Sequence, residues 1–157
     1  MSRFVGDHLP DALFTRLSID RAFENMDRAI IIVTVDEHGW PHPAMLSSLE
    51  LVARDARNIR LAPHAASRTA RNLRANGRLA FVVADETGTF YIKGDVLLRD
   101  ATMSAAQELA KFNMRVDSVL QDVPEDYERA RIVSGIRVER RDVDRARSEA
   151  ILRELLA

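Results

Sequence analysis

The sequence contains no cysteine among its 157 residues. This absence excludes disulfide bonds, thiolate nucleophiles, zinc sites with cysteine ligands and iron–sulfur clusters, and it is consistent with a reducing compartment. Oxidation or reduction by such a chain therefore requires a borrowed cofactor.

Long apolar runs are missing as well. The N-terminal stretch MSRFVGDHLPDALFTRL carries scattered charges and has no apolar run of signal-peptide length, and no run elsewhere is long enough to span a membrane. A chain of 157 residues with 46% hydrophobic and 30% charged residues suits one globular domain, over residues 1–157. We expect a single-domain protein of the cytoplasm with no membrane partner.

Common catalytic motifs are also absent. The sequence has no Ser-His-Asp order, no Walker loop and no GxGxxG, so hydrolase and dinucleotide-fold functions have no support. No carboxylate stands at a spacing that would complete a zinc site with the four histidines, and no metal site is predicted. An aromatic content of 6% and a pI near 6.4 argue against a nucleic-acid partner, which would need aromatic rings among basic residues.

Positive charge is concentrated in one window of the chain. Residues 56–84 contain six arginines and no acidic residue, although the formal net charge of the whole chain is -1. These arginines are Arg57, Arg60, Arg68, Arg71, Arg74 and Arg78. A local excess of this kind in an otherwise acidic chain predicts a site for a small anion rather than for a polymer.

Hydrophobic periodicity predicts a mainly β protein with flanking helices. Runs rich in β-branched and apolar residues predict six strands, at residues 29–35, 43–53, 58–63, 78–84, 90–98 and 131–139. Helical spacing predicts an N-terminal helix at 10–26, a helix at 103–120 and a C-terminal helix at 143–156. Short consecutive hairpins with helices at the edges favour a small barrel with its core at 28–141 over a parallel sheet.

One short helix is inserted between the third and fourth strands. Ser67 is a good N-cap residue for it, and Gly77 is a good C-terminal stop. A strand-to-helix corner directs free backbone N–H groups and the positive end of the helix to one point, which suits a phosphate. Ser67 and Thr69 add hydroxyl donors there, and Arg68 adds a planar guanidinium that matches phosphate oxygens.

A simpler interpretation of the same residues stays open. Ser67 can serve as a helix cap alone, without a ligand. Arg71, Arg74 and Arg78 can form a solvated face that pairs with acidic residues elsewhere, and for Arg74 and Arg78 we prefer this interpretation.

Three stretches in this order resemble a known family: AIIIVTVDEHGWPHPAML, NIRLAPHAASRTARNLRANGRLAFVV and TFYIKGDVLL. Together they look like the pyridoxamine 5'-phosphate oxidase-like group of FMN-binding split β-barrels. The resemblance covers residues 28–100. It implies a six-stranded antiparallel split β-barrel with flanking helices, and a homodimer with two FMN molecules at the subunit interface.

The resemblance also implies which residues hold the flavin. The phosphate would contact Ser67, Arg68 and Thr69, with Asn72 bracing the corner. The isoalloxazine and ribityl chain would lie along Met45, Leu46, Ser47 and Ser48, the backbone of Ala62 and Pro63 would close the pocket, and Thr89 and Tyr91 would lie near the flavin.

The sequence also departs from the true oxidases. They follow Ser-Arg with lysine, where this chain has Thr69, and they carry an Arg-Leu-x-Pro segment near the C-terminus, where this chain has SGIRVERRDVDRAR. The resemblance therefore implies an FMN-dependent oxidoreductase that exchanges hydride at flavin N5 with a nicotinamide or organic donor, and not with pyridoxamine phosphate. Two alternatives remain: a flavin-binding protein without turnover, such as a stress-associated partner, and a relative that binds the deazaflavin F420 or haem.

Overall fold

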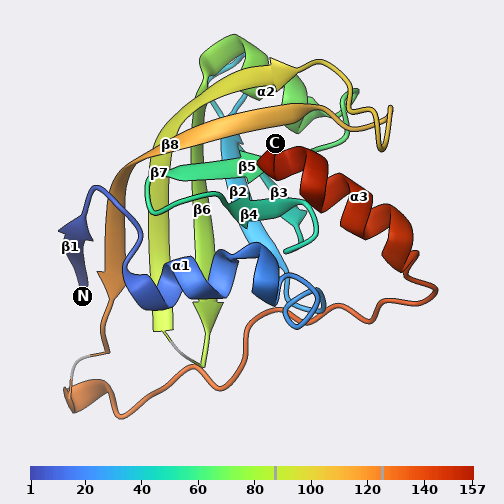
Figure 1. Ribbon diagram of the computed structural model, residues 1–157. Helices are drawn as coiled ribbons and strands as arrows, with labels where there is room; N and C mark the ends of the chain where they lie inside the picture. Colours follow the sequence, from blue (N-terminus) through green and yellow to red (C-terminus); the bar gives the residue numbers. More distant parts are fainter. Residues whose placement is uncertain (87, 125) are drawn as a thin grey trace.

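The computed structural model describes residues 1–86, 88–124 and 126–157. Within them, eight strands form one antiparallel sheet in the order β3-β2-β6-β7-β8-β5-β4, with β1 paired to β8. The strands are β1 (Ser2–Gly6), β2 (Ile30–Val35), β3 (Pro41–Leu46), β4 (Leu51–Ala53), β5 (Asn58–Leu61), β6 (Arg78–Asp85), β7 (Gly88–Asp100) and β8 (Lys111–Asp122). The long strands β7 and β8 bend strongly, so the sheet curls into a half-barrel (Figure 1).

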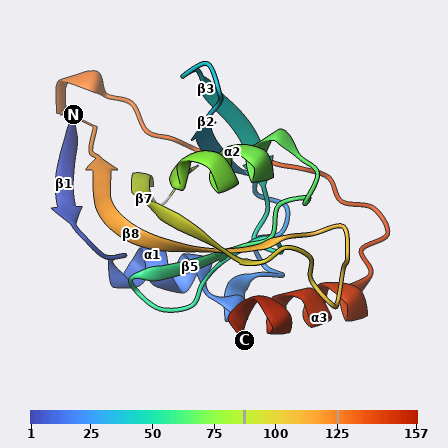
Figure 2. The ribbon, with the colours of Figure 1, turned by 90° about the horizontal axis from the view of Figure 1, so that it is seen from above.

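Three α-helices accompany the sheet in the described residues: α1 (Asp11–Leu17), α2 (Arg68–Asn76) and α3 (Arg145–Leu156). Short 3-10 turns follow at η1 (Ile19–Arg21) and η2 (Asp126–Glu128). Helix α2 lies at one end of the curved sheet, α1 crosses the other end, and α3 packs on a separate side (Figures 1 and 2). The prediction of a split β-barrel with flanking helices is confirmed.

The concave face of the sheet carries the main core. On β6 the side chains of Leu79, Phe81 and Val83 are buried, while their neighbours on the strand are half-exposed. This alternation is what a strand with one buried face requires. Leu13 of α1 and Leu73 of α2 pack into the same cluster, so each helix covers part of the concave side.

A second, smaller core lies beneath α3. Ile151, Leu152 and Leu155 of the helix are buried against Val52 of β4 and Met103 of the loop before β8. Because α3 has its own apolar contacts, it is attached to the β4–β5 edge and does not enter the barrel.

The opposite face of the sheet, which we call the outer face, is apolar but uncovered over much of its width. Cross-strand pairs place Met45 beside Ile31, Ile31 beside Val82, Val82 beside Tyr91, and Tyr91 beside Leu120. Side chains that are directly paired across strands share a face. Met45 is 61% exposed at the end of this row.

The predicted second strand at 43–53 is two strands, which is one reason why eight strands replace six. A tight turn interrupts it, because the backbone N–H groups of Glu50 and Leu51 both donate to the Ser47 carbonyl, at 2.9 and 3.0 Å. Strand β3 therefore pairs with β2, whereas β4 pairs with β5.

The predicted helix at 103–120 is wrong, because most of that stretch is β8. The buried residues Phe112, Met114 and Val116 alternate along it, and this period of two belongs to a strand. Pairing on both sides, with β7 and β5, outweighs the helical spacing that the preceding Met103 and Ala106 suggested.

Two further predictions need correction. The N-terminal helix ends at Leu17, and the rest of 10–26 continues as η1 and turns, although Leu17 and Ala22 are buried as the predicted stripe requires. The predicted strand at 131–139 is an irregular extended segment with an isolated bridge, between Arg137 and Arg28. We call residues 129–143 the strap; it leads from η2 to α3 along the bottom of Figure 1.

Candidate functional site

The N-terminus of α2 has the capping that its sequence predicts. Ser67 is the N-cap, and its Oγ accepts a hydrogen bond from the backbone N–H of Ala70 at 3.1 Å. Gly77 ends the helix in the left-handed conformation with φ of 61°, which a residue with a side chain rarely adopts. The boundaries of this corner are therefore determined by local chemistry.

The first turn of α2 is positively charged, and the nearby Asp36 carboxylate, in the turn after β2, interacts electrostatically with its Arg68. The first turn itself contains no acidic residue and begins with the exposed Arg68. Among the described residues, no protein acceptor faces the backbone N–H groups of Arg68 and Thr69. Unpaired N–H groups, the helix dipole and a guanidinium favour an anion at the same place. The residues present thus fit the phosphate end of a flavin nucleotide.

The corner is held rigidly against the sheet. Asn72 is buried, and its Nδ2 donates to the hydroxyl of the buried Thr34 on β2 at 2.9 Å. Asn76 Nδ2 donates to the Val35 carbonyl at 2.5 Å. These bonds attach the middle and the C-terminal end of α2 to β2, and they thereby fix the direction in which the helix N-terminus points.

The connection from β5 to α2 is also ordered by hydrogen bonds. Ala62 and Pro63 are buried, the Ala62 N–H donates to the Glu50 carbonyl at 2.8 Å, and the Pro63 carbonyl accepts from Ala110 at 3.0 Å. His64 Nδ1 lies 3.3 Å from the N–H of Ala66, which donates to it. The backbone of Ala62 and Pro63 is thus held in place just before the corner formed by Ser67, Arg68 and Thr69.

The predicted residues of the second strand have different environments. Met45 projects from the outer face, and Leu46 points into the core. Ser47 and Ser48 are buried in the turn after β3, where Ser47 Oγ donates to Glu50 Oε2 at 2.9 Å and Ser48 Oγ donates to the Ala22 carbonyl at 2.5 Å. Both serine hydroxyls therefore have structural partners.

Thr89 and Tyr91 lie on the same sheet but far from α2. Arg78, directly after α2, starts β6, whereas Thr89 pairs with Ala84 six residues further along that strand. At ~3.3 Å per residue this separation is roughly 20 Å. Burial raises the pKa of the Tyr91 phenol, and the Asp122 carboxylate, 3.4 Å from its hydroxyl, adds to the shift.

Two clefts open along the sheet, one near each end of β6. One of about 480 Å³ lies beside the start of β6 and is lined by Val33, Val35, Arg78 and Lys93, among others. Another, of about 640 Å³, lies at the far end, between the strap and the hairpin of β6 and β7, and includes Thr89.

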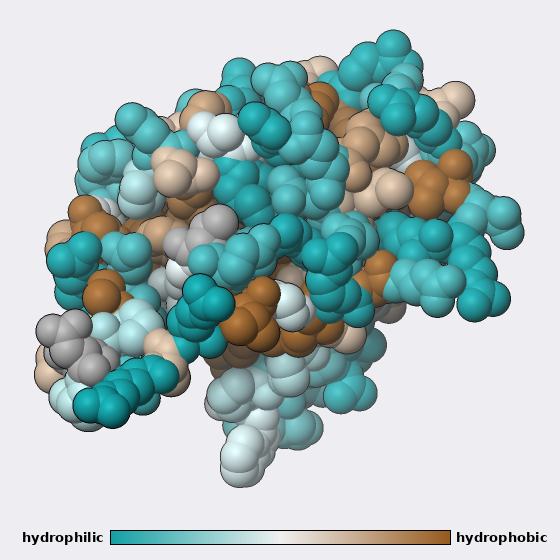
Figure 3. Space-filling view, turned by 90° about the horizontal axis from the view of Figure 1, so that it is seen from below, coloured by the Kyte–Doolittle hydropathy of each residue, from teal (hydrophilic) through white to brown (hydrophobic). Residues whose placement is uncertain are grey.

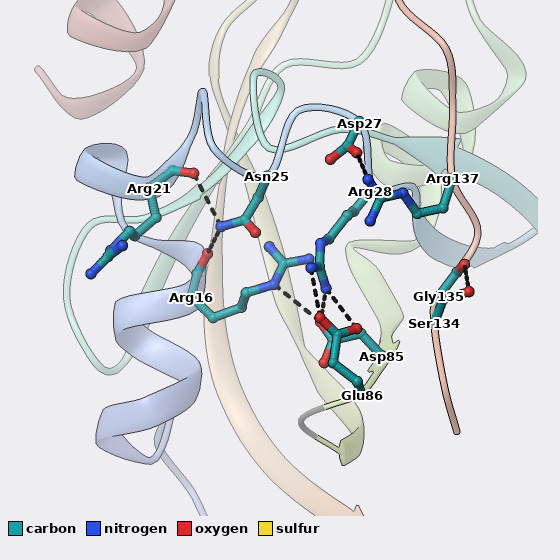
Figure 4. Close-up of polar contacts among 10 residues, drawn as sticks. All are labelled: Arg16, Arg21, Asn25, Asp27, Arg28, Asp85, Glu86, Ser134, Gly135 and Arg137. Atoms are coloured by element: carbon teal, nitrogen blue, oxygen red, sulfur yellow. Dashed lines mark hydrogen bonds and ion pairs between the residues drawn. The ribbon is translucent and has the colours of Figure 1, made fainter. Parts of the chain in front are cut away.

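The sequence did not predict a buried ionic cluster near that second cleft. Asp85 is 2% exposed, and its Oδ2 lies 3.2 Å from Arg16 Nε and 3.3 Å from Arg28 Nη1 (Figure 4). Arg28 also forms two hydrogen bonds with Glu86, at 3.0 and 2.7 Å, which raise the pKa of Arg28 and lower that of Glu86. The feature of the sequence that could have indicated this cluster is Asp85 itself, an acidic residue directly after the apolar run of β6.

The strap is joined to the same region. Arg137 pairs with Asp27, the Ala29 N–H donates to the Ile136 carbonyl at 2.9 Å, and the Val138 N–H donates to the Asp27 carbonyl at 2.7 Å. In the described ranges, no group of three or more His, Cys, Asp or Glu side chains has the arrangement of a metal site. No helix there is long and apolar enough to cross a membrane.

The curled antiparallel sheet with its flanking helices defines the chain as a split β-barrel. The sequence profile of the pyridoxamine 5'-phosphate oxidase family matches residues 20–146. The chain belongs to this family, as its sequence motifs predicted.

Individual relatives agree with this assignment. The uncharacterized protein YclD of Bacillus subtilis (strain 168) is 30% identical over 131 residues, which cover 83% of each chain. A crystal structure from Lactobacillus delbrueckii, provisionally named a pyridoxamine 5'-phosphate oxidase, superposes with a TM-score of 0.59 at 14% identity, over 76% of this chain and 98% of that one. HupZ of Group A Streptococcus superposes with a TM-score of 0.54 at 12% identity, over 68% of this chain and 99% of that one. These two structures share the fold.

Proposed function

We propose that this protein is an FMN-binding oxidoreductase of the cytoplasm that does not act on pyridoxamine phosphate. The observation that carries the proposal is the first turn of α2, where Arg68 and two unpaired N–H groups meet and no acidic residue belongs to the turn. Ser67, Arg68 and Thr69 would bind the phosphate, and Asn72 would position the helix. Family membership supports a flavin nucleotide as the anion.

The bound flavin would supply hydride exchange at its N5 atom. The residues of the chain bind and orient it: the backbone of Ala62 and Pro63 lies beside the corner, and Met45 offers an exposed apolar contact on the adjoining strand. We assign no general base.

The proposed site requires a second copy of the chain. Counted along β6 from Arg78, which follows the C-terminal end of α2, Tyr91 lies opposite Val82 about 13 Å away and Thr89 lies opposite Ala84 about 20 Å away, at ~3.3 Å per residue. The proposal therefore assigns the corner and these two residues to different subunits. A two-fold dimer through the outer face would bring Thr89 and Tyr91 of the partner to the flavin held by Arg68.

The exposed apolar surface supports this dimer. Met45 is 61% exposed and Trp40 is 71% exposed, and the strap exposes Val133 at 74%. Several apolar side chains are visible in the view of the molecule from below (Figure 3). Burial of such surface is a main driving force of association.

The departure at Thr69 supports the change of substrate. Where the true oxidases have a second cation after Ser-Arg, this chain has a buried threonine. Arg68 alone then supplies side-chain charge to a phosphate at the first turn. The chain also lacks the C-terminal segment that the oxidases use, since its strap carries SGIRVERRD at that point.

An absorption spectrum tests the cofactor. The purified protein is mixed with FMN, passed down a desalting column and scanned, in parallel with the deazaflavin F420 and haem. Retained flavin bands at one FMN per chain support the proposal. Retention of F420 or haem in place of FMN would overturn it. Retained FMN that no reduced nicotinamide or organic donor reduces would favour a flavin-binding protein without turnover.

A further inference from the structure

Helix α2 carries a row of arginines that form no ion pair among the described residues, although Asp36 interacts electrostatically with Arg68 and Asp95 lies opposite Arg78 on β7. Arg68, Arg71 and Arg74 are exposed at three-residue steps, and Arg78 follows directly after the helix. Across the part of the chain that the structure describes, no carboxylate lies within ion-pair distance of these four residues. Pairing with the acidic remainder, which we expected for Arg74 and Arg78, is thus not found.

Other arginines of the protein do form ion pairs. Arg16 and Arg28 pair with Asp85, Arg57 pairs with Asp7, and Arg147 pairs with Glu108. The chain therefore has enough acidic residues to pair with arginines, but they lie elsewhere.

The row is unfavourable for the helix on its own. Like charges three or four residues apart repel each other on a helix surface. A cation in the first turn, such as Arg68, also opposes the helix dipole. An arrangement with these costs is relieved when anions bind along it.

One phosphate at the first turn does not use the whole row. At ~1.5 Å rise per residue, Arg71 lies about 4.5 Å and Arg74 about 9 Å further along the axis than Arg68. Arg74 donates through Nη1 to the Ala65 carbonyl at 2.9 Å, so it is partly occupied, whereas Arg71 has no recorded partner in the described ranges. Arg71 is therefore placed for a second anionic group beside the first.

Nucleic acid does not suit this surface. Binding of a single strand requires aromatic rings beside the cations. The Phe112 ring lies 5.8 Å from the Arg74 guanidinium but is fully buried, as is Phe81, so neither can stack on a base. Phe90 packs against the core and Tyr91 lies on the outer face.

We propose that the α2 arginine row, with Arg71 at its centre, binds the 2'-phosphate of a phosphorylated nicotinamide dinucleotide, so that NADPH is preferred to NADH as electron donor. This inference rests on the proposed flavin function. Arginine matches the geometry of a phosphate monoester by forming two parallel hydrogen bonds. In the reaction, the reduced nicotinamide loses a hydride and is oxidised, and that hydride with one proton from water reduces the flavin.

The test uses binding and reduction on the same protein. FMN is titrated first into the wild type, Arg71→Ala and Arg153→Ala, where Arg153 is an exposed arginine of α3 that has no ion pair in the described residues. NADP⁺ and NAD⁺ are then titrated into the FMN-loaded proteins by calorimetry. Anaerobic stopped-flow mixing with NADPH or NADH gives the rate of flavin reduction against donor concentration.

We expect the wild type to bind NADP⁺ at least tenfold more tightly than NAD⁺. Arg71→Ala should lose most of this preference, with NAD⁺ and FMN affinities within twofold of wild type, and Arg153→Ala should match the wild type. Equal affinities for NADP⁺ and NAD⁺ in the wild type, or equal losses for both in Arg71→Ala, would overturn the inference while the flavin function stands.

Failure of the flavin function has a different signature. A wild type that does not retain FMN contradicts the proposed function, and NADP⁺ is then titrated into the protein as purified. A preference for NADP⁺ that Arg71→Ala removes would still assign the row to the 2'-phosphate. No preference would overturn both proposals, and tight binding of single-stranded DNA would assign the row to nucleic acid instead.

Discussion

Asn72 of α2 donates a hydrogen bond to the hydroxyl of Thr34 on β2, at 2.9 Å, and both residues are at least 97% buried. A polar pair of this kind inside an apolar core has one well-satisfied arrangement. It therefore determines how α2 meets the sheet, and with it where the unpaired N–H groups of the first turn point.

The first prediction concerns this pair. Asn72→Ala leaves the Thr34 hydroxyl without its donor and a small cavity beside it, so it should lower the free energy of unfolding by about 1–3 kcal/mol. FMN affinity should fall as well, because α2 loses a hydrogen bond that holds it against β2. Urea denaturation and flavin titration measure the two effects.

A control variant distinguishes the effect of losing the buried hydrogen bond from the effect of a changed helix propensity. Asn76→Ala removes an exposed amide from the same helix and should cost less stability than Asn72→Ala. Equal losses in the two variants would contradict the role assigned to the buried pair.

The second prediction concerns the phosphate contact. Arg68→Ala should weaken FMN binding by roughly 1.5–3 kcal/mol, the scale of a hydrogen bond to a charged group. Arg78→Ala should leave the affinity nearly unchanged, because Arg78 lies beyond the other end of α2. Titration of flavin fluorescence gives both values, and equal losses would show that the phosphate lies elsewhere.

The third prediction concerns stability in acid. The hydrogen bonds from Arg28 lower the pKa of Glu86 in the folded protein. A lowered carboxyl pKa adds stability that is fully present above the pKa of the unfolded chain, ~4.3, and is lost as the pH falls through the folded value. Glu86→Gln should therefore reduce stability near neutral pH and flatten its decline between about pH 5 and pH 3.

Stability curves in urea at several pH values measure this effect. Glu37→Gln, at an exposed carboxylate in the turn between β2 and β3, is the control and should retain the slope of the wild type. An unchanged slope for Glu86→Gln would mean that the Arg28 pair does not contribute.

The fourth prediction concerns the strap. A Cβ atom on Gly135 would lie 2.4 Å from the Ala84 carbonyl oxygen, closer than two such atoms approach. Gly135→Ala should therefore push the strap away from β6, lower the Tm by several degrees and increase proteolysis between residues 129 and 143. Ser134→Ala, one residue earlier on an exposed side chain, should leave both unchanged. Normal protease resistance in Gly135→Ala would show that the strap tolerates a larger separation.

Interactions between neighbouring residues were enough to predict several secondary-structure elements from the sequence. The run Ile30–Val35 has β-branched residues that favour a strand, and Ser67 and Gly77 bound α2 because capping depends on neighbouring residues alone. The order of motifs was also sufficient to predict the family, and the family match confirms it. The cofactor-contacting roles of Arg68 and Met45 stay predictions.

Tertiary structure decided the rest. The stretch Lys111–Asp122 has apolar residues that suit either a helix or a strand, and pairing with both β7 and β5 decided for the strand. The hydrogen bond between Asn72 and Thr34 joins residues that are 38 positions apart in the sequence. The absence of ion pairs along α2 in the described residues likewise depends on where the fold places the carboxylates. By itself, then, the sequence determined the helix caps, the strongest strands and the local excess of arginine, because these depend on neighbouring residues along the chain. Only the fold decided which strand pairs with which and which charges meet, because those partners come from distant parts of the chain.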